Sequence, residues 1–321
     1  MLKVTCLGET MALFIPNAGA PTAPSEGAAA APGEAETGYT VQIGGAESNV
    51  ACALTRLGVP ARWIGRVGDD RFGRLVVDTL TGHGVDVSEV ETDPVRPTGL
   101  YVKEFTRAGT RIRYYRSGSA ACAMSPALAA RPSVRDTHWL HLSGITAALS
   151  EDCAALLEAI LRVPVPGRTV SFDVNWRPAL WRGRDPAPLL ALARRADVVF
   201  VGSDEAEALW GVSEPEQIRR LIPEPYTLVV KRGAEGAVAI EGGETVRVHA
   251  LPVDVVEATG AGDAFAAGYL AGAVRRMPLR ARLSLGTRTA RSALLVSGDF
   301  AGPAGHQAGA PGPRAGLAMS Q

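Results

Sequence analysis

A glycine-rich segment in the last quarter of the chain carries the residue types of a phosphate-transfer site. Positions 259–265 read TGAGDAF, and a helical apolar pattern starts at Phe265. Gly260 and Gly262 allow the backbone to curl so that successive N–H groups point into one cavity, and the helix that begins there adds the positive end of its dipole. We therefore predict that the backbone N–H groups of Gly260, Ala261 and Gly262 form an anion site that fits a phosphate.

Asp263 lies in the first turn of the same helix, where an aspartate taken alone most often serves as a cap. A carboxylate beside a phosphate site can also accept the proton of an attacking hydroxyl while the anion site stabilises the transferred group. The flanking glycines favour this second interpretation, so Asp263 is the candidate general base. The segment does not match a dinucleotide-binding fingerprint, because Phe265 occupies the place of the third glycine.

Composition and charge exclude several classes of protein. The 321 residues contain 33 Lys+Arg and 33 Asp+Glu, so the chain lacks the basic field that a nucleic-acid-binding protein needs. No apolar stretch approaches the ~20 residues of a membrane span, and the first ten residues resemble a short strand, which predicts a soluble, cytoplasmic protein without membrane partners. The four cysteines include no C-x-x-C pair, which argues against a metal cluster or a disulfide framework.

The elements that must position the site alternate between strands and helices. Apolar, strand-like runs at 62–66, 139–143, 169–174 and 198–201 are each followed by a helical pattern, at 72–82, 151–162, 188–195 and 204–210. This alternation predicts a mostly parallel sheet with helices on both faces, which is a three-layer α/β/α sandwich. A second hairpin pattern at 228–240 precedes the final helices.

Two segments differ from this alternation. Residues 39–43 and 98–116 have strand patterns, and 107–110 has the composition of a hairpin turn, so we predict a small antiparallel sheet set apart from the main one. Positions 16–36 contain 15 Ala, Gly or Pro among 21 residues, and 301–321 contain 14 of 21. Because such segments have too little apolar bulk to offset the entropy of ordering, we expect a long loop and a disordered tail.

Two motifs resemble the signatures of the ribokinase-like, or PfkB, carbohydrate kinases. GAGD at 260–263 is similar to the C-terminal signature of that family, and GGAESNVACALTRLG at 44–58 is similar to its N-terminal signature. The resemblance runs from residue 2 to residue 299. It implies a ribokinase-like sandwich formed by 1–9, 44–95 and 117–300, and a small β-sheet lid formed by 10–43 and 96–116, with 301–321 outside both.

Four further segments resemble 2-keto-3-deoxygluconate kinases within that family. They are TGLY at 98–101, YYRSGSA at 114–120, HLSGI at 141–145 and DVNWR at 173–177. The resemblance implies an ATP-dependent kinase that phosphorylates the 6-hydroxyl of this sugar acid, with substrate contacts from Gly44, Gly45, Asn49, Tyr101, Tyr114, Arg116, Ile145 and Arg177. An acidic sugar needs a cation, and arginine presents a planar fork to a carboxylate, which supports the two arginines independently.

The resemblance also implies ATP and Mg²⁺ as cofactors. It assigns nucleotide contacts to Ser203, Lys231, Gly233, Gly236, Gly260 and Gly262, although the KRGAEG hairpin at 231–236 would by itself be an ordinary turn. Glu207 is expected to act on Mg²⁺ through water, in a DEAE sequence where the family has N-x-x-E. Glu257 stands where the family usually has an aspartate near a monovalent-cation site, so a K⁺ requirement stays open.

Several alternatives remain at this point. Fructokinases and other relatives share D-x-N-x-R, so that motif does not separate a neutral sugar from an acidic one. A non-catalytic sugar-binding protein would keep the pocket without a base, whereas Asp263 is present. A nicotinamide oxidoreductase is disfavoured because no early G-x-G-x-x-G occurs. The exposed strand edges of the predicted lid, together with family habit, predict a homodimer or higher homo-oligomer through the lid.

Overall fold

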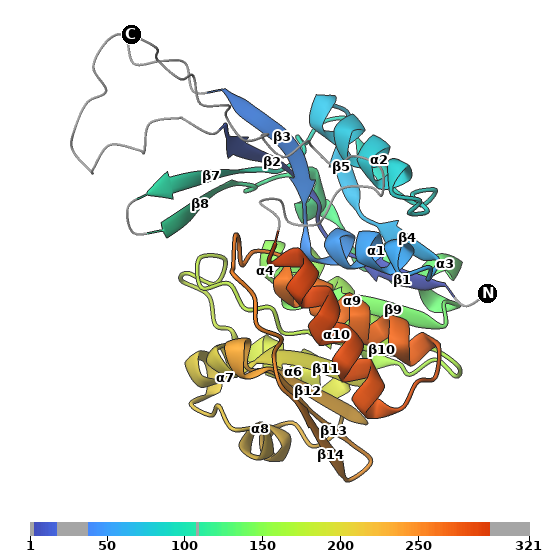
Figure 1. Ribbon diagram of the computed structural model, residues 1–321. Coiled ribbons are helices and arrows are strands. Elements are labelled where there is room, and N and C mark those ends of the chain that lie inside the picture. Colours follow the sequence, from blue (N-terminus) through green and yellow to red (C-terminus); the bar gives the residue numbers. More distant parts are fainter. Residues whose placement is uncertain (1–2, 18–37, 107–108, 296–321) are drawn as a thin grey trace, which may run out of the picture.

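A computed structural model describes residues 3–17, 38–106 and 109–295, and its main feature is an eight-stranded sheet (Figure 1). The strand order is β14-β13-β12-β11-β10-β9-β1-β4. The strands span β1 (Val4–Leu7), β4 (Ala61–Ile64), β9 (Trp139–Ser143), β10 (Thr169–Asp173), β11 (Val198–Gly202), β12 (Thr227–Lys231), β13 (Ala237–Glu241) and β14 (Glu244–Val248). All neighbours from β12 to β4 pair in parallel, and β13 and β14 add an antiparallel edge. The predicted mostly parallel sheet is confirmed.

Helices cover both faces of this sheet because its central strands are apolar on both sides. One apolar cluster joins the sheet to α1 (Ala46–Arg56), α2 (Arg71–Gly82), α9 (Ala261–Val274) and α10 (Leu279–Ala293). The other joins it to α3 (Pro132–Arg135), α4 (Gly144–Leu149), α5 (Glu151–Arg162), α6 (Ala187–Arg195), α7 (Ser203–Trp210), α8 (Pro215–Leu221) and the 3-10 turns η1 (Ala120–Ala123) and η2 (Pro126–Ala130). The two clusters confirm the three-layer α/β/α sandwich. Within the described ranges, no helix is long and apolar enough to cross a membrane.

A separate four-stranded sheet has the order β3-β2-β7-β8 (Figure 1). It comprises β2 (Met11–Pro16), β3 (Tyr39–Gly44), β7 (Leu100–Thr106) and β8 (Gly109–Tyr115). The prediction that this sheet is antiparallel is wrong at its centre, where β2 and β7 pair in parallel. The chain enters the small sheet twice, once with β2 and once with β7. Both strands therefore run away from the large sheet. The outer pairs, β2 with β3 and β7 with β8, are antiparallel hairpins.

The segments that connect the small sheet to the rest of the chain meet at Glu9, which lies between β1 and β2. Ser119, just beyond β8, donates a hydrogen bond from Oγ to Glu9 Oε1 (2.9 Å), and Arg116 forms an ion pair with Oε2. A Cβ on Gly45 would lie 2.2 Å from the Glu9 carbonyl oxygen, and one on Gly99 would lie 3.0 Å from Oε1. The other three connections therefore pack against this one glutamate. At Gly45 the approach leaves no room for a side chain, and at Gly99 it leaves little.

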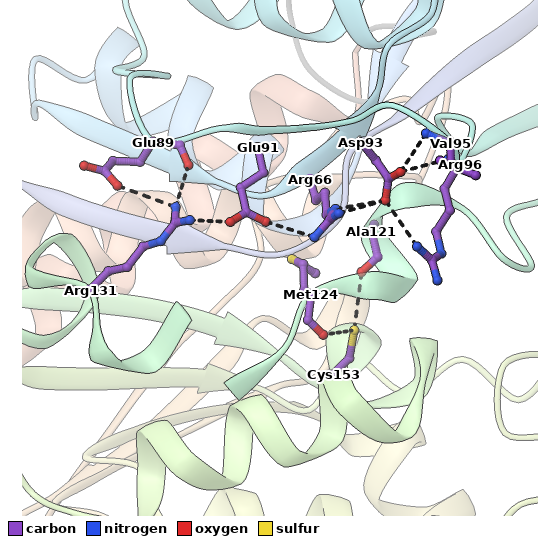
Figure 2. A network of polar contacts seen from close by, with 10 residues as sticks. All are labelled: Arg66, Glu89, Glu91, Asp93, Val95, Arg96, Ala121, Met124, Arg131 and Cys153. Atoms are coloured by element: carbon purple, nitrogen blue, oxygen red, sulfur yellow. Dashed lines mark hydrogen bonds and ion pairs between the residues drawn. The ribbon is translucent and has the colours of Figure 1, made fainter. Parts of the chain in front are cut away.

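A chain of ion pairs supports the segment that leads into β7 (Figure 2). It runs along a two-stranded parallel sheet of β5 (Arg66–Gly68) and β6 (Glu91–Asp93), where Arg66 reaches Asp93 Oδ2 (3.0 Å) and Glu91 Oε2 (3.4 Å). Arg131 pairs with Glu91 on its other side. Asp93 Oδ1 also accepts hydrogen bonds from the backbone N–H groups of Val95 and Arg96, each 2.9 Å. These contacts hold the chain just before it enters the small sheet.

Parts of the prediction lie outside the described residues. Most of the expected loop at 16–36 and all of the expected tail at 301–321 fall there, and so does part of the turn at 107–110. The domain boundaries stay a prediction. Within the described part of the chain, the predicted boundaries of the strands and helices of the alternating pattern lie within two residues of the observed ones. The sequence patterns did not predict the strands β2, β5, β6 and β14 or the helices α3, α4 and α8.

Candidate active site

A cavity of about 480 Å³ lies between the small sheet and the carboxyl ends of the large sheet. Thirteen of the predicted site residues line it: Gly44, Gly45, Asn49, Tyr101, Tyr114, Arg116, Ile145, Arg177, Lys231, Gly233, Gly260, Gly262 and Asp263. They come from β3, α1, β7, β8, α4, the end of β12, α9 and the loops beside them. Ligands of open parallel sheets bind at this edge. The cavity therefore brings together segments that are up to about 200 residues apart in the sequence.

Asp263 lies at the base of this cavity and is held by two side-chain amides. Asn49 Nδ2 donates to Oδ2 (2.8 Å), and Asn175 Nδ2 donates to Oδ1 (3.4 Å). The carboxylate is therefore not occupied in capping its own helix turn. Burial raises the pKa of Asp263 to about 7, and the nearby charge of Asp173 raises it further, while the hydrogen bond from Asn49 lowers it. A carboxylate with this pKa can both accept and release a proton near neutral pH.

The glycine turn before Asp263 has the backbone shape that an anion site requires, with one difference from the prediction. Gly260 caps α9 with φ 81°, a left-handed conformation that favours glycine. The N–H of Ala261 donates to the carbonyl oxygen of Ala258 (3.3 Å), and Ala261 does not line the cavity. Its N–H is therefore engaged within the turn. The N–H groups of Gly260 and Gly262 have no hydrogen-bond partner among the described residues, so these two remain the candidates for the anion site.

Lys231 is part of an ion pair that the sequence did not reveal. Its Nζ lies 2.9 Å from Asp173 Oδ1 and 2.8 Å from Oδ2, and a Cβ on Gly262 would lie 3.5 Å from the same nitrogen. Burial lowers the pKa of Lys231, but the charges of Asp173 and Glu205 outweigh it and hold the pKa above its usual value. The ammonium therefore stays charged beside the anion site.

The same ion pair supports Asn175, which adopts a left-handed backbone with φ 41°. Asp173 Oδ1 accepts a hydrogen bond from the backbone N–H of Asn175 (3.2 Å). Residues other than glycine adopt this conformation at a cost of about 1 kcal/mol or more, unless their surroundings hold them there. Lys231 therefore acts on Asp263 indirectly. It fixes Asp173, which holds Asn175, and Asn175 in turn donates a hydrogen bond to Asp263.

Replacing Lys231 by methionine is expected to destabilise the fold by about 3–5 kcal/mol, because Asp173 is 2% exposed and would be left as an unpaired buried charge. Denaturant unfolding followed by far-UV circular dichroism measures this. The double variant Lys231→Met with Asp173→Asn is the matched control and should recover at least half of the loss. If the single and double variants unfold at the same denaturant concentration, the pair does not contribute as described.

The two arginines predicted to bind an acid differ in their surroundings. Arg116 is 8% exposed, is paired with Glu9, and stacks its guanidinium 5.5 Å from the centroid of the Tyr114 ring. Tyr114 in turn stacks on Tyr101, with ring centroids 5.6 Å apart. Arg177 is half-exposed and lies 3.7 Å from Glu205 Oε1. Both arginines line the cavity.

Four predicted residues do not line the cavity. Besides Ala261, these are Ser203, Glu207 and Gly236. Ser203 begins α7, and its neighbours Gly202 and Asp204 line the cavity in its place. Glu207 is exposed and does not line the cavity, whereas Glu205, two residues earlier in the same helix, does. Gly236 shapes the hairpin instead: its φ is 108°, and a Cβ there would lie 2.0 Å from the Val248 carbonyl oxygen.

The sequence patterns missed four residues of the site that have a common signal: Glu9, Asn175 and Glu205 line the cavity, and Asp173 holds Asn175. Glu9 follows β1, Asp173 ends β10 with Asn175 just beyond it, and Glu205 lies in the first turn after β11. All of them are polar residues at the carboxyl ends of parallel strands, which is where such sheets bind ligands. From DVNWR at 173–177 the resemblance supplies only Arg177, although Asp173 and Asn175 lie at the same strand end.

Glu257, in the loop before the glycine turn, pairs with a lysine of the small sheet. Lys103 Nζ from β7 lies 3.3 Å from Glu257 Oε2, and Lys103 is fully buried. Glu257 Oε1 accepts hydrogen bonds from the N–H groups of Ala258 (3.0 Å) and Thr259 (3.2 Å). An ammonium group already neutralises this carboxylate, so its surroundings do not fit a potassium ion at Glu257. The pair also connects the small sheet to the anion site.

Comparison with known proteins agrees with this geometry. A model of the pfkB family carbohydrate kinases matches residues 1–303. The chain is 37% identical to a 2-dehydro-3-deoxygluconokinase of Thermoproteus tenax, over 81% of this chain and 82% of that one. It is 34% identical to the protein of the same name in Bacillus subtilis strain 168, over 82% and 84%. A crystal structure of a PfkB protein from Polaromonas sp. JS666 superposes with a TM-score of 0.80 at 31% identity, covering 91% of this chain and 96% of that one. The chain belongs to the PfkB family of carbohydrate kinases.

Proposed function

We propose that the protein transfers the terminal phosphate of ATP to the 6-hydroxyl of 2-keto-3-deoxygluconate, which is the 2-dehydro-3-deoxygluconate of the relatives' names. The observation that carries this proposal is the buried Asp263 carboxylate, oriented by two amides beside a glycine turn at the start of a long helix. Arg116 and Arg177 in the same cavity support an acidic sugar, because both can offer N–H donors to a carboxylate.

In the proposed reaction, Asp263 accepts the proton of the 6-hydroxyl as that oxygen bonds to the γ-phosphorus and the bond from the phosphorus to the bridging oxygen of ADP breaks. The N–H groups of Gly260 and Gly262 and the positive end of α9 bind the negative charge of the transferred group. Lys231 adds a fixed positive charge beside Gly262. The nucleotide enters along the turn that carries Gly233, which is the part of the hairpin that lines the cavity.

The described residues fit Mg²⁺ in the way that kinases usually hold it. They contain no group of three or more potential ligands that could hold a metal ion by itself. Mg²⁺ commonly binds through one or two carboxylates, water and the substrate phosphates. Asp204 and Glu205 line the cavity and are the residues that would hold it, in place of Glu207. When bound, the ion neutralises charge on the β- and γ-phosphates.

The rate is expected to rise with pH up to neutrality. Only the ionised form of Asp263 can take the proton, and its pKa is raised to about 7, so kcat/KM should increase about tenfold per pH unit between pH 5 and 6.5 and level off by pH 8. Initial rates in overlapping buffers of constant ionic strength measure this profile. A profile that is already flat at pH 5.5 would show that Asp263 ionises with an ordinary pKa.

An ADP-coupled assay on a panel of sugars tests the proposed function. The panel contains 2-keto-3-deoxygluconate, its galactonate epimer, fructose, ribose and adenosine. Turnover confined to the keto-deoxy acids is the expected result. Preference for fructose would favour the fructokinase alternative, and tight sugar binding without turnover would favour a sugar-binding protein. A homodimer through the small sheet stays a prediction.

A further inference from the structure

Glu9 is a buried carboxylate in the wall of the cavity, and the proposed reaction gives it no role. Its side chain is 1% exposed. Oε1 accepts a hydrogen bond from Ser119 Oγ (2.9 Å), and Oε2 pairs with Arg116. A buried carboxylate is costly unless it is paired, so the contact with Arg116 stabilises both groups in the empty protein.

Arg116 uses only part of its hydrogen-bonding capacity in this pair. A guanidinium has five N–H donors in a planar fork. Glu9 contacts the Nη2 end, whereas Nε is buried and has no hydrogen-bond partner among the described residues. Because Arg116 lines the cavity, a ligand carboxylate can approach it only as a second anion beside Glu9.

We propose that Glu9 is a specificity-determining residue. It pairs with Arg116 where a substrate carboxylate would otherwise pair, and so limits the affinity of the cavity for acidic sugars. This proposal rests on the proposed function. In the empty protein the pair is neutral, so a neutral sugar meets no unpaired charge. An acidic sugar must share Arg116 with Glu9, and the repulsion between the two carboxylates offsets part of the attraction to the guanidinium.

Neutralising Glu9 is therefore expected to strengthen the binding of acids selectively. In Glu9→Gln, the side chain keeps its shape and can still accept the hydrogen bond from Ser119, but Arg116 becomes an uncompensated buried cation. The substrate carboxylate then supplies the missing charge. A role for Glu9 in structure alone predicts a lower Tm with no difference between acidic and neutral ligands.

Titration calorimetry of the full-length protein with 2-keto-3-deoxygluconate and with fructose distinguishes these roles. For Glu9→Gln we expect the Kd of the acid to fall about tenfold, and the Kd of fructose to stay within twofold. The matched control is Glu104→Gln, which neutralises the partner of Arg113, an exposed arginine on the same strand as Tyr114, and should change neither Kd. The rise in Tm on adding the acid should also be larger in Glu9→Gln than in the wild type.

An unchanged or higher Kd for the acid in folded Glu9→Gln overturns the proposal, as does an equal change for both ligands. If Glu9→Gln does not fold, Glu9→Asp withdraws the carboxylate by one methylene and should shift the Kd of the acid in the same direction, by about threefold. Failure of the proposed function gives a different result, because the wild type would then not turn over the acid, whereas Glu9→Gln would still gain affinity for it.

Discussion

Replacing Asp263 by asparagine is expected to lower kcat for sugar phosphorylation by about 10³-fold, within the range that a general base contributes. The asparagine keeps one acceptor oxygen for Asn49 or Asn175, so the cavity keeps its shape while the proton acceptor is lost. Single-turnover and steady-state rates with saturating ATP measure the loss. The KM of the sugar should change much less than kcat, because the carboxylate acts mainly in the transition state.

Stability separates this loss from unfolding. Asp263 has an ordinary pKa of 3.8 and a folded pKa of about 7, so the folded protein holds the proton more tightly than the unfolded chain does. The stability that this proton contributes is fully present below about pH 4 and is lost as pH rises through 7. Asp263→Asn should therefore unfold at the same or a higher temperature than the wild type at pH 8. The matched control is Asp254→Asn, which changes an exposed carboxylate in the preceding loop and should leave kcat unchanged. A variant Asp263→Asn that keeps more than a tenth of the rate would contradict the assignment of the base.

Removing the positive charge at Arg116 is expected to lower kcat/KM for the sugar acid by about 10²-fold or more, as the loss of a buried charged hydrogen bond does. Arg116→Met alone would leave Glu9 unpaired, so the variant to make is Arg116→Met with Glu9→Gln. The loss for fructose should stay within a few-fold, because a neutral sugar has no carboxylate to pair. Steady-state kinetics with both sugars measure the difference.

The control for this prediction is Arg113→Ala, which removes an exposed arginine whose partner is Glu104. It should change neither rate. Together with the single Glu9→Gln variant, the expected order of affinity for the acid is Glu9→Gln above the wild type, and the wild type above the double variant. Equal losses for the acid and for fructose would show that Arg116 does not recognise a carboxylate, and the acidic substrate would be wrong.

Sequence reasoning succeeded where the physical signal is local. The strand β9 and the helix α5 have the predicted boundaries, because a buried strand or an amphipathic helix is written in consecutive side chains. The glycine turn and Asp263 were found for the same reason. The parallel pairing of β2 with β7 could not be found in this way, since the alternation of side chains along a strand does not depend on the direction of its neighbour.

The missed parts of the site depend on contacts between distant segments. The pairing of Lys231 with Asp173 joins residues 58 positions apart, and the contact of Asn49 with Asp263 joins residues 214 positions apart. No local pattern contains such a pair. Glu205 lines the cavity and Glu207 does not, and this depends on which face of α7 meets the cavity, with Ala206 buried between them in the sequence. The engagement of the Ala261 N–H with Ala258 depends on the conformation of the turn itself.

The convergence of four connections on Glu9 limits how this enzyme can be recombined with its relatives. A chimera that exchanges β2, β3, β7 and β8 alone would join a new small sheet to the old Glu9, Gly45, Gly99 and Ser119. If the exchange extended into the connections, a donor residue larger than glycine at position 45 would collide with the Glu9 carbonyl oxygen, and one at position 99 would crowd the Glu9 side chain. The small sheet is therefore not an independent module. To be exchanged intact, the small sheet must be moved together with the ends of its connecting segments, which carry Glu9, Gly45, Gly99 and Ser119. The substrate range of a chimera would therefore depend on these connecting residues as well as on the exchanged strands.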